Sequence, residues 1–159
     1  MTLMILEDTR HAFCNMKTLN LLSAVIASQK ALEAGVDEAV LHRNGMVTEC
    51  THSNIFIITK NNELKTAPIS NMILPGVARA HLINACKKHN VEVIEKRYSL
   101  KELCEADEII VTSSSKMAKG VKRVDGKCVG GKDEKLLKKL QDERYLDYLN
   151  ATSIKKDGE

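Results

Sequence analysis

The dipeptide Asn44-Gly45 restricts the fold of this chain more than any other feature of the sequence. It separates two short segments with apolar residues, 38–42 and 46–49. Asn-Gly between such segments is a strong signal for a type I′ turn, because both central residues of that turn need a positive φ. The sequence therefore predicts a β-hairpin here. A lone hairpin is marginal in water, so other strands must complete a sheet around it.

Strand-like and helical segments alternate along the rest of the 159 residues. Extended or strand segments are predicted at 1–9, 55–59, 64–67, 91–94, 108–111, 121–124 and 127–129. Helices are predicted at 18–34, at 77–89, after a capping box that begins at Ser99, and at 133–149. No repeat or linker interrupts the pattern. It predicts one α/β (mixed α+β) domain over residues 1–154, with a solvated tail at 155–159.

The predicted helix at 18–34 has Thr18 as its N-cap and Gly35 as its C-terminal stop. Its apolar residues recur at steps of three and four, which predicts that they form the buried face: Leu22, Val25, Ile26 and Leu32. Lys17 lies just ahead of this helix, in a segment with few other charges. Most lysines are solvated surface residues. A partly desolvated amine, however, is more readily neutral and suits Schiff-base chemistry.

Composition argues against several classes of partner. The net charge is only +3, and the chain has no Trp, two Phe and three Tyr, which disfavours nucleic-acid binding. No apolar run is long enough to span a membrane, and no signal-peptide pattern begins the chain, so a cytoplasmic location is predicted. The cysteines form no CxxC pair, which predicts buried reduced thiols and no metal site: Cys14, Cys50, Cys86, Cys104 and Cys128.

Three further features point to the same chemistry as Lys17. Glu49 is a carboxylate at the end of the hairpin, within the polar segment 48–54. Segment 74–79 places a glycine at a helix N-terminus, where free N–H groups attract phosphate. Segment 112–115 places hydroxyls after a buried strand. Each feature alone fits a surface strand end, a helix cap or a polar turn. Together they supply an amine, a carboxylate and an anion site, which pyridoxal phosphate needs.

The sequence resembles the pyridoxal-phosphate aminotransferases of fold type IV over nearly its whole length. The carrying segments are Glu7-Asp8-Thr9-Arg10, Lys17-Thr18-Leu19-Asn20-Leu21-Leu22, His42-Arg43-Asn44-Gly45 with Val47-Thr48-Glu49, Ser53-Asn54-Ile55-Phe56, Asn71-Met72-Ile73-Leu74-Pro75-Gly76 with Arg79, and Val111-Thr112-Ser113-Ser114. The resemblance implies the family's cofactor-binding domain, a mixed sheet or pseudo-barrel with surrounding helices. The segment after Lys17 favours the branch that acts on D-amino acids. Branched-chain aminotransferases and aminodeoxychorismate lyases are the alternatives.

The resemblance also implies a role for each site residue. Lys17 matches the lysine that holds pyridoxal phosphate and then moves a proton at the substrate Cα. Glu49 matches the carboxylate beneath the pyridine nitrogen, and Leu74 matches the residue packed on the ring face. The implied phosphate-binding residues are Gly76, Val77, Ala78, Ser113 and Ser114.

Some positions depart from the family pattern. Cys50 and His52 stand where small residues are expected, and Ala78 stands where a threonine would add a hydroxyl to the phosphate site. The family's N-terminal domain, which supplies an arginine to the phosphate, has no counterpart in these residues. The resemblance implies amino acid and 2-oxo acid substrates and a homodimer, without a nucleic-acid or membrane partner. A self-associating inactive scaffold is the alternative outside enzymes.

Overall fold

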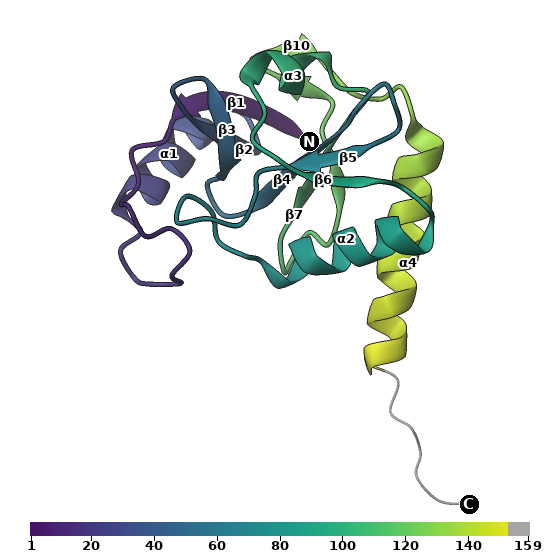
Figure 1. The fold of residues 1–159 in the computed structure, drawn as a ribbon. Coiled ribbons are helices and arrows are strands. Elements are labelled where there is room, and N and C mark those ends of the chain that lie inside the picture. Colours follow the sequence, from purple (N-terminus) through teal and green to yellow (C-terminus); the bar gives the residue numbers. More distant parts are fainter. Residues whose placement is uncertain (153–159) are drawn as a thin grey trace, which may run out of the picture.

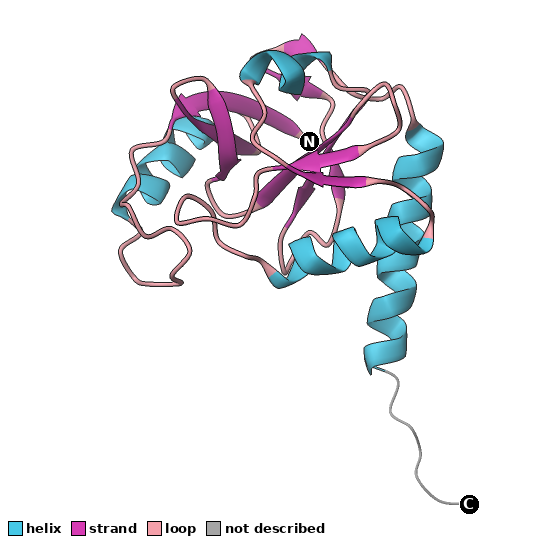
Figure 2. Cartoon of the chain, in the orientation of Figure 1, coloured by secondary structure: helices cyan, strands magenta, loops and turns pink. Residues whose placement is uncertain are grey.

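The computed structural model describes residues 1–152, without the side chain of Cys128. The predicted tail at 155–159, and the last two residues of the predicted domain, lie outside this range. Figures 1 and 2 show the elements. In chain order they are β1 (Thr2–Glu7), α1 (Leu22–Glu33), β2 (Glu38–Arg43), β3 (Met46–Cys50), β4 (Asn54–Ile58), β5 (Leu64–Thr66), α2 (Val77–Lys88), β6 (Val93–Glu95), α3 (Leu100–Glu105), β7 (Glu108–Thr112), β8 (Lys119–Gly120), β9 (Arg123–Val124), β10 (Lys127–Cys128) and α4 (Glu134–Thr152).

The strands within residues 1–152 form two mixed sheets of five strands each. The first sheet has the order β10-β9-β1-β2-β3, in which β1 runs parallel to β2 and to β9. The second has the order β6-β5-β4-β7-β8, in which β4 runs antiparallel to β5 and to β7. The chain passes from the first sheet to the second in the turn between β3 and β4. This arrangement confirms the predicted α/β (mixed α+β) fold class.

Backbone angles confirm the predicted hairpin at Asn44-Gly45 and show that the predicted strand segments 121–124 and 127–129 also meet in a hairpin. Asn44 and Gly45 have φ values of 50° and 76°, and β2 pairs antiparallel with β3 around them. Asp125 and Gly126 have φ values of 46° and 73° between β9 and β10. In both turns the residues tolerate the left-handed region that the connection requires.

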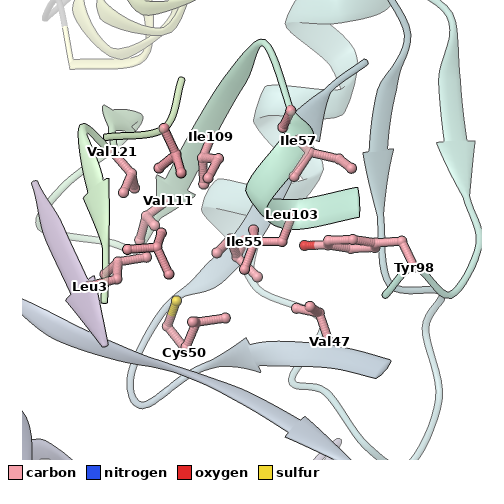
Figure 3. Packing of buried hydrophobic residues seen from close by; sticks show 14 residues of the cluster. Leu3, Val47, Cys50, Ile55, Ile57, Tyr98, Leu103, Ile109, Val111 and Val121 are labelled. Carbon is pink, nitrogen blue, oxygen red and sulfur yellow. The ribbon is translucent and has the colours of Figure 1, made fainter. Parts of the chain in front are cut away.

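Apolar side chains from both sheets share one interior, so the sheets pack face to face. Figure 3 shows these side chains pointing toward one another; they include Leu3, Val47 and Cys50 from the first sheet and Ile55, Ile57, Ile109 and Val111 from the second. A second cluster lies between β4, β7 and the helices α2 and α4. A third joins α1 to β2 through Ala27, Ala31, Ala39 and Leu41. Helices therefore cover the outer faces of both sheets (Figure 1).

Helix α1 differs from its prediction at its start and in its buried face. It begins at Leu22 rather than Thr18, and its N-cap residue, Leu21, makes no side-chain capping bond. The Thr18 hydroxyl instead accepts a hydrogen bond from the Asn20 N–H at 3.2 Å, in the loop before the helix. Gly35, with φ 68°, follows the C-terminal turn as predicted.

The predicted apolar face of α1 is exposed. The exposed fractions are 70% for Leu22, 58% for Val25, 49% for Ile26 and 71% for Leu32. The neighbouring stripe, with Ala27 and Ala31, lies on the sheet instead. Small side chains allow a helix to lie close to a sheet, so the alanine stripe is the one that packs, and the larger residues are left outward.

Smaller differences concern the ends of elements and one cysteine. Strand β6 spans Val93–Glu95 rather than 91–94, and the short β8 was not predicted. The Ser99–Glu102 capping box is present at the start of α3. Cys104 is exposed, contrary to the prediction, whereas Cys14, Cys50 and Cys86 are buried, and all four thiols are free. No helix within residues 1–152 is long and apolar enough to cross a membrane.

Candidate active site

A cavity of about 620 Å³ is the place where the predicted site residues meet. Four segments line it: the loop between β1 and α1, the turn between β3 and β4, the loop that enters α2, and the turn after β7. Every residue that the sequence assigned to the site lies on its wall: Lys17, Glu49, Leu74, Gly76, Val77, Ala78, Ser113 and Ser114. The fold therefore brings four distant parts of the chain to one cavity.

The carboxylate of Glu49 is buried and held by donors from three segments. Strand β3 places it in the cavity wall with an exposed fraction of 5%. Its Oε2 accepts a hydrogen bond from Asn54 Nδ2 at 2.9 Å, and the Leu74 N–H lies 3.1 Å from each oxygen. The Arg10 guanidinium donates to Oε1 and pairs with its charge. These contacts fix the orientation of the carboxylate toward the cavity.

Arg10 is a site residue to which the sequence assigned no role. It follows β1 and lines the cavity, and its Nε and Nη2 each donate to the Asp8 carboxylate at 2.8 Å. Asp8 is buried and also accepts from the Thr48 hydroxyl at 3.0 Å and from Arg43 Nε at 3.2 Å. An acidic and a basic residue two positions apart directly after a strand were the available signal, because such residues are seldom buried unless they pair.

The charges in this network change one another's protonation. Burial alone would lower the pKa of Arg10, but hydrogen bonds to Asp8 and the charge of Glu49 raise it above its usual value. Burial would raise the pKa of Asp8, but the Arg10 and Arg43 guanidinium groups hold it below its usual value. For Glu49, burial outweighs Arg10 and the Leu74 N–H and raises the pKa to about 7.

The raised pKa of Glu49 predicts a stability that depends on pH. An unfolded glutamate loses its proton near pH 4.5, whereas folded Glu49 keeps its proton up to about pH 7. The resulting stabilisation is complete below pH 4.5 and is lost as pH rises through about 7. Between those pH values we expect the unfolding free energy to fall by about 3 kcal/mol relative to Glu49→Gln. Urea unfolding of both proteins across this range measures the difference, and a constant difference would contradict the shift.

The N-terminus of α2 forms a second wall of the cavity. Its N-cap residue, Gly76, offers no side-chain cap, and Val77 and Ala78 belong to the first turn, whose N–H groups lack acceptors within the helix. A Cβ at Gly76 would lie only 2.3 Å from Asn54 Oδ1, so this close approach requires glycine. Free N–H groups and the helix dipole together favour an anion at this wall.

Hydroxyl groups at the end of β7 and in the turn after it line another part of the cavity. The Thr112 Oγ1 is buried and has no hydrogen-bond partner, although Thr112 lines the cavity. Ser113 Oγ lies 3.3 Å from Ser115 Oγ, and Ser114 is exposed at the same wall. An orphaned buried hydroxyl and a free helix N-terminus on one cavity are a donor set that fits a phosphate group.

Lys17 lies on a loop rather than at the mouth of a helix. It is exposed and lines the cavity together with its neighbours Met16 and Thr18. The loop that carries it runs from β1 to α1 and extends from the body of the molecule (Figure 1). The expected amine and the expected carboxylate are thus on walls of the same cavity, with the amine on its exposed side.

The sequence pattern of the class IV amino-transferases matches residues 2–124. A D-alanine aminotransferase from Bacillus licheniformis is 36% identical over 148 residues, which are 92% of this chain and 52% of that protein. The chain spans about half the length of the curated relatives it matches, with shares of 52%, 41% and 49% among them.

Solved structures share the fold. The branched-chain amino acid aminotransferase of Escherichia coli aligns with a TM-score of 0.81 and 25% identity, over 99% of this chain and 53% of that one. A putative 4-amino-4-deoxychorismate lyase from Legionella pneumophila aligns with a TM-score of 0.80 and 30% identity, over 94% and 55%. The match over most of its length and the shared fold show that this chain belongs to the class IV amino-transferase family.

Proposed function

We propose that the protein is a pyridoxal-phosphate-dependent aminotransferase that moves the amino group of D-amino acids to 2-oxo acids, as in D-alanine plus 2-oxoglutarate giving pyruvate plus D-glutamate. The observation that carries this proposal is the meeting of Lys17, Glu49 and the α2 N-terminus at one cavity. Relatives named D-alanine aminotransferase support the substrate class. We further propose that residues 1–154 are one cofactor-binding domain, supported by the interior that both sheets share.

The residues present fit the phosphate and the pyridine nitrogen of this cofactor. When bound, pyridoxal phosphate supplies a ring that accepts electrons from the Cα of an attached amino acid. The phosphate would be bound by the free N–H groups of Val77 and Ala78 after Gly76 and by the hydroxyls of Ser113 and Ser114. The orphaned hydroxyl of Thr112 would add a donor. Leu74 would pack on one face of the ring.

Lys17 and Glu49 carry the chemical steps in this proposal. Lys17 Nζ would hold the cofactor through a covalent bond, and once released it would move the proton at the substrate Cα. Glu49 would hydrogen-bond to the pyridine nitrogen and keep a proton there, which makes the ring a better electron acceptor. Arg10 and Asn54 act through Glu49, because both bind its carboxylate and fix its orientation.

The substrate is tested by supplying the protein with saturating pyridoxal phosphate and one amino donor at a time. D-alanine with 2-oxoglutarate should yield pyruvate and D-glutamate, while L-leucine should yield little product. Transfer from L-leucine would favour a branched-chain aminotransferase instead. Release of pyruvate from aminodeoxychorismate without a 2-oxo acid would favour the lyase reaction. Absence of all three reactions, with no cofactor bound, would favour the inactive scaffold.

The exposed apolar face of α1 predicts self-association. Leu22, Val25, Ile26 and Leu32 are each about half exposed or more, and Leu19 in the preceding loop is 97% exposed. Large apolar side chains exposed together on one helix face are typical of an interaction surface. We propose that a second copy covers it in a two-fold homodimer, the commonest closed assembly.

Light scattering should give twice the mass of one chain, and Val25→Lys should shift the protein to monomers. Lys30→Gln, a change elsewhere on the exposed surface of α1, should leave the dimer intact. A uniform monomer for the unmodified protein would contradict the proposal.

We also propose a cytoplasmic location for the protein. The four free thiols among the described cysteines support it.

A further inference from the structure

Glu38 is a buried carboxylate with an unusual set of partners. It is the first residue of β2, and its side chain has an exposed fraction of 0%. Its Oε1 accepts from the His52 N–H at 2.9 Å and from the Thr51 hydroxyl at 3.3 Å. Its Oε2 accepts from the Ser53 hydroxyl at 3.0 Å and from Lys116 Nζ at 2.8 Å. Burial of a carboxylate requires such pairing, and here the chain provides it in full.

The partners of Glu38 belong to two neighbouring turns that contribute residues to the cavity lining. Residues 51–53 form the turn between β3 and β4, and all three line the cavity. Lys116 belongs to the turn after β7, whose Ser113 and Ser114 also line the cavity, beside the first turn because Asn54 of β4 pairs with Thr112 of β7. The Lys116 N–H donates to Ser113 Oγ at 3.2 Å and lies 3.2 Å from the Ser113 carbonyl oxygen. The carboxylate thus ties the two turns together from outside the cavity.

His52 joins the two turns a second time. Its Nε2 lies 3.2 Å from Lys116 Nζ, and its Nδ1 lies 3.1 Å from Thr51 Oγ1 and 3.3 Å from Glu38 Oε1. A lysine ammonium can only donate, so Nε2 must accept this hydrogen bond. In the neutral imidazole the proton is then on Nδ1, directed at Thr51 and Glu38. The imidazole, which also lines the cavity, is therefore held in one orientation.

We propose that Glu38 and Lys116 form a clamp that positions both turns, and that this clamp sets how tightly the cavity binds the phosphate end of its cofactor. The clamp consists of the Glu38–Lys116 ion pair and the hydrogen bonds from residues 51–53 to Glu38. The second half of this inference rests on the proposed function, whereas the first rests on the contacts alone. Glu38 and Lys116 are positioning residues, because neither lines the cavity.

Three variants and a matched control test the clamp. Glu38→Gln keeps the shape of the side chain but places an amide nitrogen toward Ser53 or Lys116, where an acceptor is needed. Lys116→Met removes the ion pair, and Lys116→Arg keeps a cation. Lys132→Met is the control. Lys132 Nζ lies 3.2 Å from the Asp107 carboxylate, and neither residue lines the cavity.

The first readout is amide hydrogen exchange by NMR, recorded without cofactor. Exchange at 51–53 and 113–117 should be about tenfold faster in Glu38→Gln and Lys116→Met, because one charge-assisted contact is lost. Lys116→Arg and Lys132→Met should leave these turns unchanged. The second readout is a titration with pyridoxal phosphate. Its dissociation constant should rise about tenfold in Lys116→Met and recover in Lys116→Arg, with little change in kcat.

Each outcome decides one half of the inference. Unchanged exchange in both turns overturns the clamp, whether or not the cofactor binds. Faster exchange with an unchanged dissociation constant, or an equal rise in Lys132→Met, overturns its effect on the cofactor site. Failure of the unmodified protein to bind pyridoxal phosphate would contradict the proposed function instead, and hydrogen exchange would then decide the clamp by itself.

Discussion

Replacing Lys17 with alanine is expected to abolish covalent attachment of pyridoxal phosphate and to reduce turnover by about 10⁴-fold or more. The reason is that Lys17 is the amine proposed both to hold the cofactor and to move the proton at the substrate Cα. Its exposed position on a loop means that its removal leaves the core clusters intact. Folding should therefore be unchanged, and the circular-dichroism spectrum should match that of the unmodified protein.

The attachment site is measured by borohydride treatment in saturating pyridoxal phosphate, followed by peptide mapping. The pyridoxyl label should be found on Lys17 and should disappear in the alanine variant. Lys30→Ala is the matched control, since Lys30 is another exposed lysine, in the last turn of α1. A label on another lysine, or full turnover in Lys17→Ala, would show that the assignment is wrong.

Glu49→Gln should reduce kcat by about 10²–10³-fold while the affinity for the cofactor changes only a few-fold. A neutral amide cannot stabilise a proton on the pyridine nitrogen, and that interaction matters most when Cα loses its proton. The amide would also place a second donor against Arg10 or the Leu74 N–H, both of which now donate to the carboxylate. Kinetics and a cofactor titration on the same preparation separate the two effects.

A matched control for this change is Glu92→Gln, at an exposed position outside the cavity lining. It should leave both kcat and cofactor affinity unchanged. An unaltered rate in Glu49→Gln would mean that another group interacts with the ring nitrogen. A loss of cofactor binding with no change in kcat at saturation would mean that Glu49 contributes only to binding.

Local chemistry in the sequence was sufficient for much of the fold, and together with the family resemblance it predicted residues that line the cavity. Asn44-Gly45 and Asp125-Gly126 specify their turns because few other residues adopt a positive φ easily. The Ser99–Glu102 box specifies the start of α3 through bonds made within four residues. The predicted site residues all line one cavity. The residue types indicated an amine, a carboxylate and an anion site, and the family resemblance implied the individual residues.

Tertiary structure decided which faces are covered and which charges pair. The spacing of Leu22, Val25 and Ile26 identifies an apolar face of α1, but the sheet covers the alanine stripe with Ala27 and Ala31 instead. Periodicity describes one element, whereas burial depends on the element that packs against it. The pairs Arg10–Glu49 and Glu38–Lys116 join residues far apart in the chain. No local pattern encodes such pairs, because only the packing of the two sheets and their connecting loops brings the charges into contact.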